Sequence, residues 1–226
     1  MPMKAHKSKP RAKAAAGRVK PDIPAGIPHS TAADLFFAGP EVVVRDCILE
    51  ILAVIDCSFR SVVIEGCILK RVSFARSKLM GLRLRDVRLV ECDFANAEVT
   101  GLKAVRVEFV NCRLTGLRAV EAECQDFLIS EGDAGYSQFR FGAFKTSKFN
   151  ACNFAEADFH GSDLRGALLK RCEFKNVDMT GAKLEGADFR GSSVEGLVVT
   201  AAELQGVIVD PAQAMIFAEL MGLNIR

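Results

Sequence analysis

Three histidines, eight cysteines and a set of regularly spaced aspartates are the side chains that could carry chemistry in this sequence. His6 and His29 lie near the N-terminus, and His160 stands far from both. A catalytic site needs titratable groups that converge in a concave pocket. Isolated histidines do not provide such a site, and the glycines follow a regular spacing rather than a phosphate-binding loop. We therefore expect no catalytic residues and no enzyme.

The aspartates recur just before large apolar residues. Each one occupies the same place in a local pattern, which predicts that it points into solvent. Successive copies should face different sides of the fold, so they cannot form a paired acid and base. The clearest examples are Asp158, Asp163, Asp178 and Asp188.

The cysteines allow two interpretations. Cys47/Cys67, Cys92/Cys112 and Cys152/Cys172 are each 20 residues apart and could pair as disulfides. Free cysteine also serves as a small buried apolar residue. We favour reduced core thiols, because the N-terminus lacks the hydrophobic stretch of a secretion signal. No histidine accompanies the cysteines at ligand spacing, so we expect no metal and no cofactor.

The cysteines, these aspartates and His160 occupy fixed positions in a five-residue repeat. The frame holds without insertion from Val42 to Val209, with a large apolar residue at each centre (Val44, Leu49 and so on) and a small residue two places earlier. These 68 sites hold no Asp, Glu, Lys or Arg, whereas the other positions of the span hold 45. Eleven of the sixteen phenylalanines stand at centres. The pattern predicts two inward side chains in every five residues.

A period of five matches neither an α-helix nor an ordinary strand. It requires a corner every five residues, so that four sides close a coil of twenty and the coils stack at about 4.8 Å. The expected fold is all-β, a right-handed quadrilateral parallel β-helix over residues 42–209 with a short C-terminal α-helix. Glycine suits corners that need positive φ, and eleven glycines stand two places after a centre: Gly66, Gly81, Gly101, Gly116, Gly161, Gly166, Gly181, Gly186, Gly191, Gly196 and Gly206.

The N-terminal region differs in composition. Residues 1–40 carry seven Lys and Arg against two Asp, a net charge of +5. Residues 1–29 are rich in Lys, Ala and Pro, which predicts a disordered basic tail. We favour a solvated arm over nucleic-acid binding. Residues 30–41 contain Leu35, Phe36 and Phe37 and are the expected plug for the open end of the coil.

The C-terminal region, residues 210–226, is predicted to be a capping and dimerisation helix. Asp210 can cap it, Pro211 suits the first turn and Gln213 can complete a capping box, with Gly222 as the stop. Its apolar residues cover more than one face, and the surplus favours a two-fold homodimer contact. The expected dimer residues are Met215, Ile216, Phe217, Leu220 and Met221.

The tandem pattern resembles the pentapeptide-repeat family, most clearly at Ala157-Asp158-Phe159, Ala187-Asp188-Phe189 and Ser162-Asp163-Leu164. The ending Glu203 to Asp210, followed by Gln213-Ala214 and an apolar helix, looks like the Qnr and MfpA proteins. That resemblance implies a dimer that binds DNA gyrase or topoisomerase IV and protects it from quinolones by imitating DNA. The unbroken frame is closer to the MfpA type, since Qnr proteins carry loop insertions. A repeat region whose charges are mixed in sign is a poor imitation of DNA.

Two surfaces are candidates for binding. The side of the coil that contains Leu49 and Leu69 has an apolar outer face, which predicts either a partner contact or a cover formed by residues 30–40. Its residues are Ile48, Ile51, Ile68, Val90, Val110, Leu128 and Leu168. A basic band could meet phosphates, an acidic protein or only water, and we favour water. Its residues are Lys70, Arg71, Arg76, Lys78, Arg83, Arg85 and Arg88.

The coil from Leu117 to Tyr136 is the least regular, because it has small centres such as Ala119 and Cys124. It is predicted either as a narrowed or kinked coil or as a bulged loop of the same length. No apolar run reaches the roughly 18 residues of a membrane span. The sequence therefore predicts a cytoplasmic, non-catalytic interaction scaffold, a homodimer with an unidentified protein partner. Topoisomerase protection is the alternative.

Overall fold

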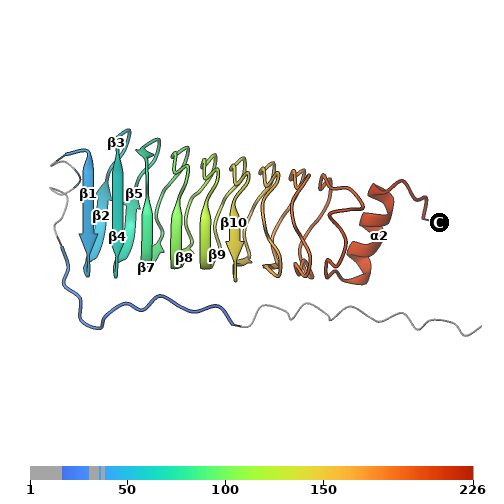
Figure 1. Ribbon diagram of the computed structural model, residues 1–226, viewed down its shortest axis with the longest axis horizontal. Helices are drawn as coiled ribbons and strands as arrows, with labels where there is room; N and C mark the ends of the chain where they lie inside the picture. Colours follow the sequence, from blue (N-terminus) through green and yellow to red (C-terminus); the bar gives the residue numbers. More distant parts are fainter. Residues whose placement is uncertain (1–16, 31–35, 37–38, 226) are drawn as a thin grey trace, which may run out of the picture.

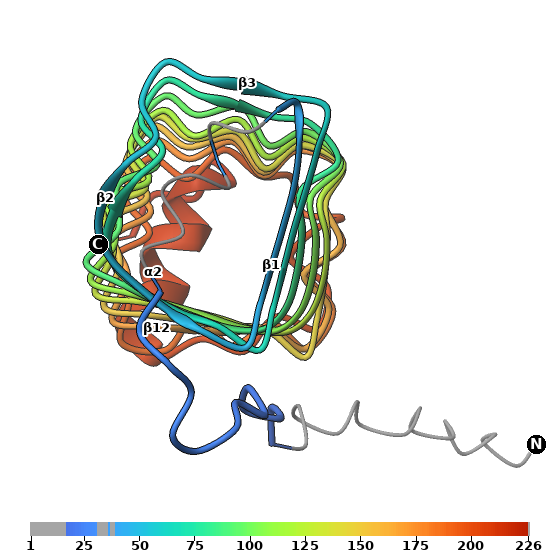
Figure 2. The ribbon, with the colours of Figure 1, turned by 90° about the vertical axis from the view of Figure 1, so that its left-hand side faces the viewer.

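The computed structural model describes residues 17–30, Phe36 and residues 39–225, which form a rod of stacked coils closed at one end by a helix (Figure 1). Viewed from its N-terminal end, the rod is a hollow quadrilateral outline whose interior the side chains fill (Figure 2). The elements are β1 (Glu41–Arg45), β2 (Ile48–Ala53), β3 (Ser58–Phe59), β4 (Ser61–Glu65), β5 (Ile68–Ser73), β6 (Lys78–Leu79), β7 (Arg83–Val90), β8 (Lys103–Val110), β9 (Glu123–Ser130), β10 (Ala143–Lys145), β11 (Lys148–Asn150), β12 (Leu168–Lys170) and α2 (Pro211–Leu220).

One register relates every pair of neighbouring coils. Strand partners are parallel and 20 residues apart from Glu41↔Ser61 at the first coil to Asp188↔Ile208 at the last. The chain turns clockwise as it recedes from the N-terminal end, which makes the solenoid right-handed (Figure 2). The predicted fold class is confirmed. We number the four sides by their centres: side 1 contains Val44 and Ile64, side 2 Leu49 and Leu69, side 3 Val54 and Phe74, and side 4 Phe59 and Leu79.

The predicted inward sites are the core. From Phe59 to Leu197 every centre, and every residue two places before a centre, is buried. The exceptions lie in the first and last coils, where no further coil covers them; Leu52 and Val209, for example, are half-buried. Burial therefore follows from stacking on both neighbours, as expected for a solenoid.

The corners use positive φ more widely than the glycines predicted. All eleven corner glycines have positive φ, for example Gly166 at 70°. Many other corners put an ordinary residue in the same left-handed region, including Ile51 at 54° and Phe141 at 56°. A β-branched or bulky residue is unfavourable there, so the stacked register fixes the corner even where the residue type opposes it.

The phenylalanines form a continuous series of ring contacts along the core. The series runs from Phe36 to Phe74 at 5.6 Å between centroids and ends with Phe174 and Phe189 at 5.4 Å. Phe154 and Phe174 stack in parallel, with 2° between the ring planes. Intermediate contacts join Phe94, Phe109, Phe127, Phe149 and Phe154.

The irregular stretch from Leu117 to Tyr136 is a regular coil, so the bulged-loop alternative is wrong. Arg118 pairs with Gln138, and β9 pairs with β8 along its whole length. The small centres Ala119 and Cys124 border an apolar internal cavity of only about 10 Å³. The walls have closed around the small side chains, because an unfilled void would forfeit dispersion contacts.

Candidate interaction surfaces

A strap formed by residues 17–30, the N-terminal strap, lies along the outside of side 2 (Figures 1 and 2). The prediction of a disordered tail is therefore wrong for this part of the tail, and residues 1–16 lie outside the described residues. At the strap's end, the Ser30 N–H donates to Ile48 O at 2.9 Å and the Ile48 N–H donates to Pro28 O at 2.9 Å. The strap thus pairs with the open strand edge of the first coil.

Arg18 is the main anchor of the strap. Its guanidinium forms an ion pair with Glu108 and donates to the backbone carbonyl of Asp126 at 3.2 Å. The two paired side chains are only 13% and 11% exposed. The next backbone N–H, of Val19, donates to Asp126 Oδ1 at 3.1 Å. A water-excluded pair of this kind is costly to break on one side only.

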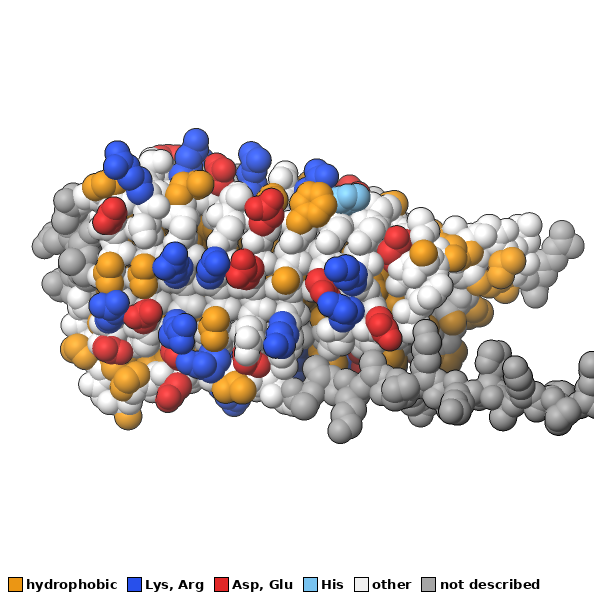
Figure 3. Space-filling model, viewed as in Figure 1, with side chains coloured by type: hydrophobic (Ala, Val, Ile, Leu, Met, Phe, Trp, Pro, Cys, Tyr) orange, Lys and Arg blue, Asp and Glu red, His pale blue; other side chains and the backbone are white. Residues whose placement is uncertain are grey.

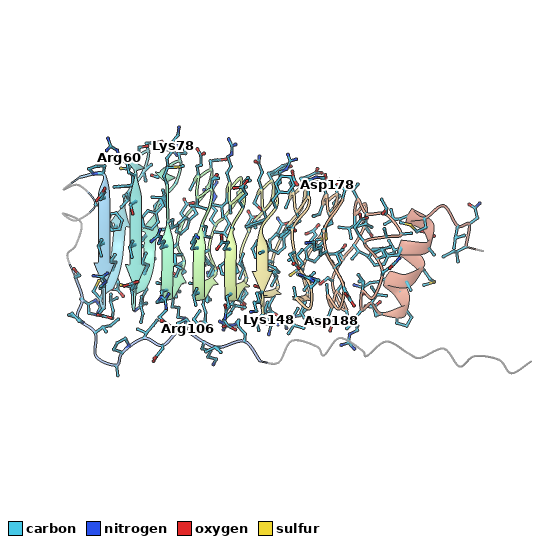
Figure 4. The ribbon with its side chains drawn as sticks, in the orientation of Figure 1. Arg60, Lys78, Arg106, Lys148, Asp178 and Asp188 are labelled. Carbon is cyan, nitrogen blue, oxygen red and sulfur yellow. The ribbon has the colours of Figure 1, made fainter. Side chains whose placement is uncertain are left out.

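Asp86 supplies the second anchor. It accepts the Asp22 backbone N–H at 2.8 Å and two hydrogen bonds from Arg106 at 2.6 and 2.5 Å. Burial alone would raise the pKa of Asp86, but Arg106 and the Asp22 N–H lower it further than burial raises it. The carboxylate is therefore ionised at neutral pH and ready to accept the strap. Figure 4 shows Arg106 on the edge of the rod that the strap follows, with Lys148 and Asp188 farther along the same edge toward the C-terminal end.

Part of the predicted apolar face lies beside the strap. Ile48 and Ile68 line one hollow together with Ile23 and Ile27 of the strap. A second hollow, beside Arg18, is lined by Val110, Leu128 and Leu168. Val90 is half-buried on the same side, whereas Ile51 stands at a corner and is 75% exposed. Within the described residues the cover comes from residues 17–30, whereas the predicted cover by residues 30–40 falls mostly outside the described residues.

The predicted basic band is a ring rather than a patch, because a single coil visits all four sides. Arg83 and Arg85 lie on side 1, Lys70 and Arg88 on side 2, and Lys78 on the edge opposite the strap (Figure 4). Three members are paired with the neighbouring coils: Lys70 with Glu50, Arg76 with Asp56 and Arg88 with Glu108; the seventh, Arg71, stands at a corner. One compact ligand could not contact the whole set.

Side 1 has a shallow hollow of about 780 Å³. The small centres Ala104 and Cys124 form part of its floor, and Arg83, Arg85 and Lys103 stand at its rim. Figure 3 shows this side, with basic and acidic side chains intermixed along it. Glu123 pairs with Lys103 at 3.4 Å, so the hollow has mixed charge.

Helix α2 closes the C-terminal end of the rod. Asp210 and Gln213 form the predicted capping box, with bonds of 2.9 and 3.0 Å. Gln213 is buried and also donates to Phe189 O and Ser192 O, both at 2.7 Å, a role that the sequence analysis missed. Phe217 is only 7% exposed and packs on the core, so its assignment as a dimer contact is wrong.

The outer surface of α2 and the residues after it are apolar and exposed. Ile216 is half-buried. The side chains that face solvent are Met215 (53% exposed), Leu220, Met221, Leu223 (62% exposed) and Ile225. Exposed apolar side chains grouped on one element are typical of an interface.

All eight cysteines are free thiols, and Cys47 Sγ lies 3.9 Å from Cys67 Sγ. Burial raises the pKa of the Cys67 thiol to about 12, and burial also raises that of Cys124. Protonated, buried thiols are poor nucleophiles. Cys67 and Cys124 are therefore packing residues.

The predicted solvent-facing groups do not converge. His160 Nδ1 lies 2.8 Å from Thr180 Oγ1, and Asp163 pairs with Arg165. Asp188 is enclosed by Arg190 and Lys170, which hold the pKa of its carboxyl well below its ordinary value. Among residues 17–30, 36 and 39–225, no group of three metal-ligating side chains occurs. No helix in the described part of the chain is long and apolar enough to cross a membrane.

The profile of the family described as "Pentapeptide repeats" matches eight copies within residues 57–96 and 152–191. The unbroken 20-residue register joins these two segments through the coils between them. The chain thus matches the pentapeptide-repeat family over these two segments. No curated protein matches it at a significant level.

Solved structures to which the chain is similar include full-length QnrB1, a plasmid-mediated fluoroquinolone resistance protein. That structure is 13% identical, with 78% of this chain and all of QnrB1 covered and a TM-score of 0.37. HetL of Nostoc, involved in heterocyst differentiation regulation, is 15% identical over 69% of this chain and 90% of its own, with a TM-score of 0.26. A pentapeptide repeat protein from the Arabidopsis thaliana thylakoid lumen is 27% identical over 47% of this chain and 71% of its own, with a TM-score of 0.21. At these scores the similarities carry no argument about function.

Proposed function

We propose that this protein is a non-catalytic binding scaffold that forms a homodimer through α2 and holds a protein partner on its outer faces. The observation that carries the proposal is the apolar outer surface of α2. The helix needs only Gln213 and Phe217 to close the rod, yet it also presents Met215, Leu220 and Met221 to solvent. A two-fold contact between two such helices would bury this surface.

The test is the oligomeric mass of the full chain, measured by light scattering after size exclusion. The wild type is expected to be a dimer at tens of micromolar and Met215→Glu a monomer, because a buried unpaired carboxylate is strongly unfavourable. Met80→Glu is the matched control, since Met80 is similarly exposed (43%) but lies on the rod. A monomeric wild type, or an unchanged mass for Met215→Glu, would overturn the dimer.

Topoisomerase protection is not the function that we propose. Competition with DNA requires a continuous negative surface. Here acidic side chains pair with basic ones of the next coil, as Asp56 does with Arg76 and Asp86 with Arg106. A gyrase supercoiling assay with and without a fluoroquinolone tests this choice. Inhibition or rescue at micromolar protein would replace our proposal with the topoisomerase role.

A further inference from the structure

The contacts of the N-terminal strap define a recognition site on the rod. Glu108 and the Asp126 carbonyl accept from the Arg18 guanidinium, and the Asp126 carboxylate accepts the next backbone N–H. Asp86 accepts a further backbone N–H, from Asp22. The three residues that carry these carboxylates are buried, each less than a tenth exposed when the whole residue is counted. The groups that contact the strap here are all acceptors, which suits a guanidinium and an extended backbone, and Arg88 and Arg106 pair with Glu108 and Asp86 beside them.

The strap is held by few contacts. None of residues 17–30 is buried, and even Ile23 and Ile27 are half-exposed above a hollow of about 490 Å³ whose floor contains Ile48 and Ile68. Segments with few buried apolar contacts open at low free-energy cost. The anchoring site, by contrast, belongs to paired strands and corners of the solenoid. The groove is more rigid than its occupant.

The hollow beside Gly17 and Arg18 offers further surface. It is also lined by Leu128, Lys148 and Leu168, with Ser147 and Asn150. A longer segment could contact this apolar and hydrogen-bonding surface in addition to the arginine site. Peptide segments often bind such surfaces through a few anchors.

We propose that side 2 is a binding groove for an extended, arginine-bearing segment of a protein partner, and that the chain's own strap occupies this groove as a competing ligand. The inference rests on the proposed binding role and gives that partner its chemistry, but it does not depend on the dimer contact. Access to the groove then requires the strap to leave. The apparent affinity for the partner is then the intrinsic affinity multiplied by the fraction of molecules whose strap is unbound.

The test uses a fluorescently labelled peptide with the sequence of residues 17–30 and the full-length chain. Arg18→Ala in the chain removes the strap's anchor and leaves the groove intact. This variant is expected to bind the peptide about tenfold more tightly than the wild type, because a tethered competitor acts at high effective concentration. The same peptide with alanine in place of its arginine is expected not to bind. Fluorescence anisotropy measures both.

Two further variants complete the design. Adding Glu108→Gln to Arg18→Ala is expected to abolish peptide binding, whereas adding Glu123→Gln, which alters an acidic side chain on side 1, should preserve it. Arg165→Ala alone, which removes an arginine paired with Asp163, should bind like the wild type. Equal affinity of wild type and Arg18→Ala, or unchanged binding after Glu108→Gln, would overturn the proposal.

Hydrogen exchange provides a measurement that needs no groove variant. The Val19 and Asp22 amides should exchange faster in Arg18→Ala than in the wild type, and equal rates would contradict a strap anchored by Arg18. Light scattering on the same samples separates the two proposals. A dimer in Arg18→Ala is expected, since α2 is unchanged; loss of the dimer would instead assign the groove to the strap of a second copy and overturn occupancy in cis.

Discussion

At each end of the rod the last coil has no neighbouring coil to cover its core, and the two ends are closed in different ways. At the N-terminal end Phe36 enters the core against Phe59 and Phe74, and residues 28–30 pair with the first coil's strand edge. At the C-terminal end a helix lies across the opening, and its polar Gln213 reaches back to two carbonyls of the last coils. One end is closed by an aromatic ring and a strand, and the other by a helix and hydrogen bonds.

This difference decides what each end presents to solvent. A plug that points inward uses its apolar residue entirely for the core. A helix laid across an opening has an inner and an outer surface, so Phe217 is buried while Met215 is exposed. Among the residues that the structure describes at the two ends, those of the C-terminal closure leave apolar surface for a partner. The N-terminal closure instead continues into a strap that covers side 2.

The largest effect is expected from Phe36→Ala. Loss of a buried phenylalanine costs about 3 kcal/mol, and no coil lies beyond it to refill the space. The free energy of unfolding from urea titration measures the loss. Phe141→Ala is the control, since Phe141 is 53% exposed at a corner and its removal should change stability little. Equal losses for the two variants would show that Phe36 does not close this end.

Gln213→Ala is expected to have the next largest effect. It removes the capping box and leaves the carbonyls of Phe189 and Ser192 without their donor, a loss of about 2 kcal/mol. Exchange of the α2 amides should rise more than that of β7 amides, because the damage is at one end. Gln205→Ala changes an exposed glutamine in the preceding turn and should leave both unchanged. A uniform rise along the rod would contradict a local role.

Lowering the pH is expected to have the smallest effect on stability and to act differently at the two ends of the rod. The Gln213 and Gly191 backbone N–H groups lower the pKa of Asp210, and Arg190 and Lys170 lower that of Asp188. A carboxyl with a lowered folded-state pKa stabilises the fold at neutral pH, and that stability is lost as the pH falls below about 4. Phe36 carries no ionisable group, but the strap does depend on one, because at Asp86 the effect of burial is outweighed by Arg106 and the Asp22 N–H, which lower its pKa. Amides of α2 and of the strap are therefore expected to lose protection before those of β4, and the reverse order would contradict this assignment.

Much of the fold could be predicted because the same inward and outward positions recur in every five-residue repeat. The absence of charge at inward sites identified the buried residues from Phe59 to Leu197, and Asp210 with Gln213 identified the helix cap. The positive φ of corner residues such as Ile51 was not predicted, because the register imposes a backbone conformation that isoleucine disfavours.

The candidate site was only partly predictable. The apolar residues of side 2 follow from the repeat, but Arg18 and Glu108 are 90 residues apart and only one of them belongs to the repeat. No periodicity links a unique tail residue to its contact. The tail's composition indicated disorder, and a few specific polar contacts on the solenoid outweigh that tendency for residues 17–30.

Because the register is unbroken, every coil of 20 residues lengthens the rod by the same distance. Removing or duplicating 20 residues within the coils would shift α2 by about 4.8 Å relative to the strap's anchors and keep every outer column on its own side. Removing five residues would instead rotate all that follows by one side, so that acidic residues of side 2 would be replaced by those of a neighbouring side. Insertions in whole coils can therefore lengthen this protein without changing its binding faces, whereas a single lost repeat would rearrange them all.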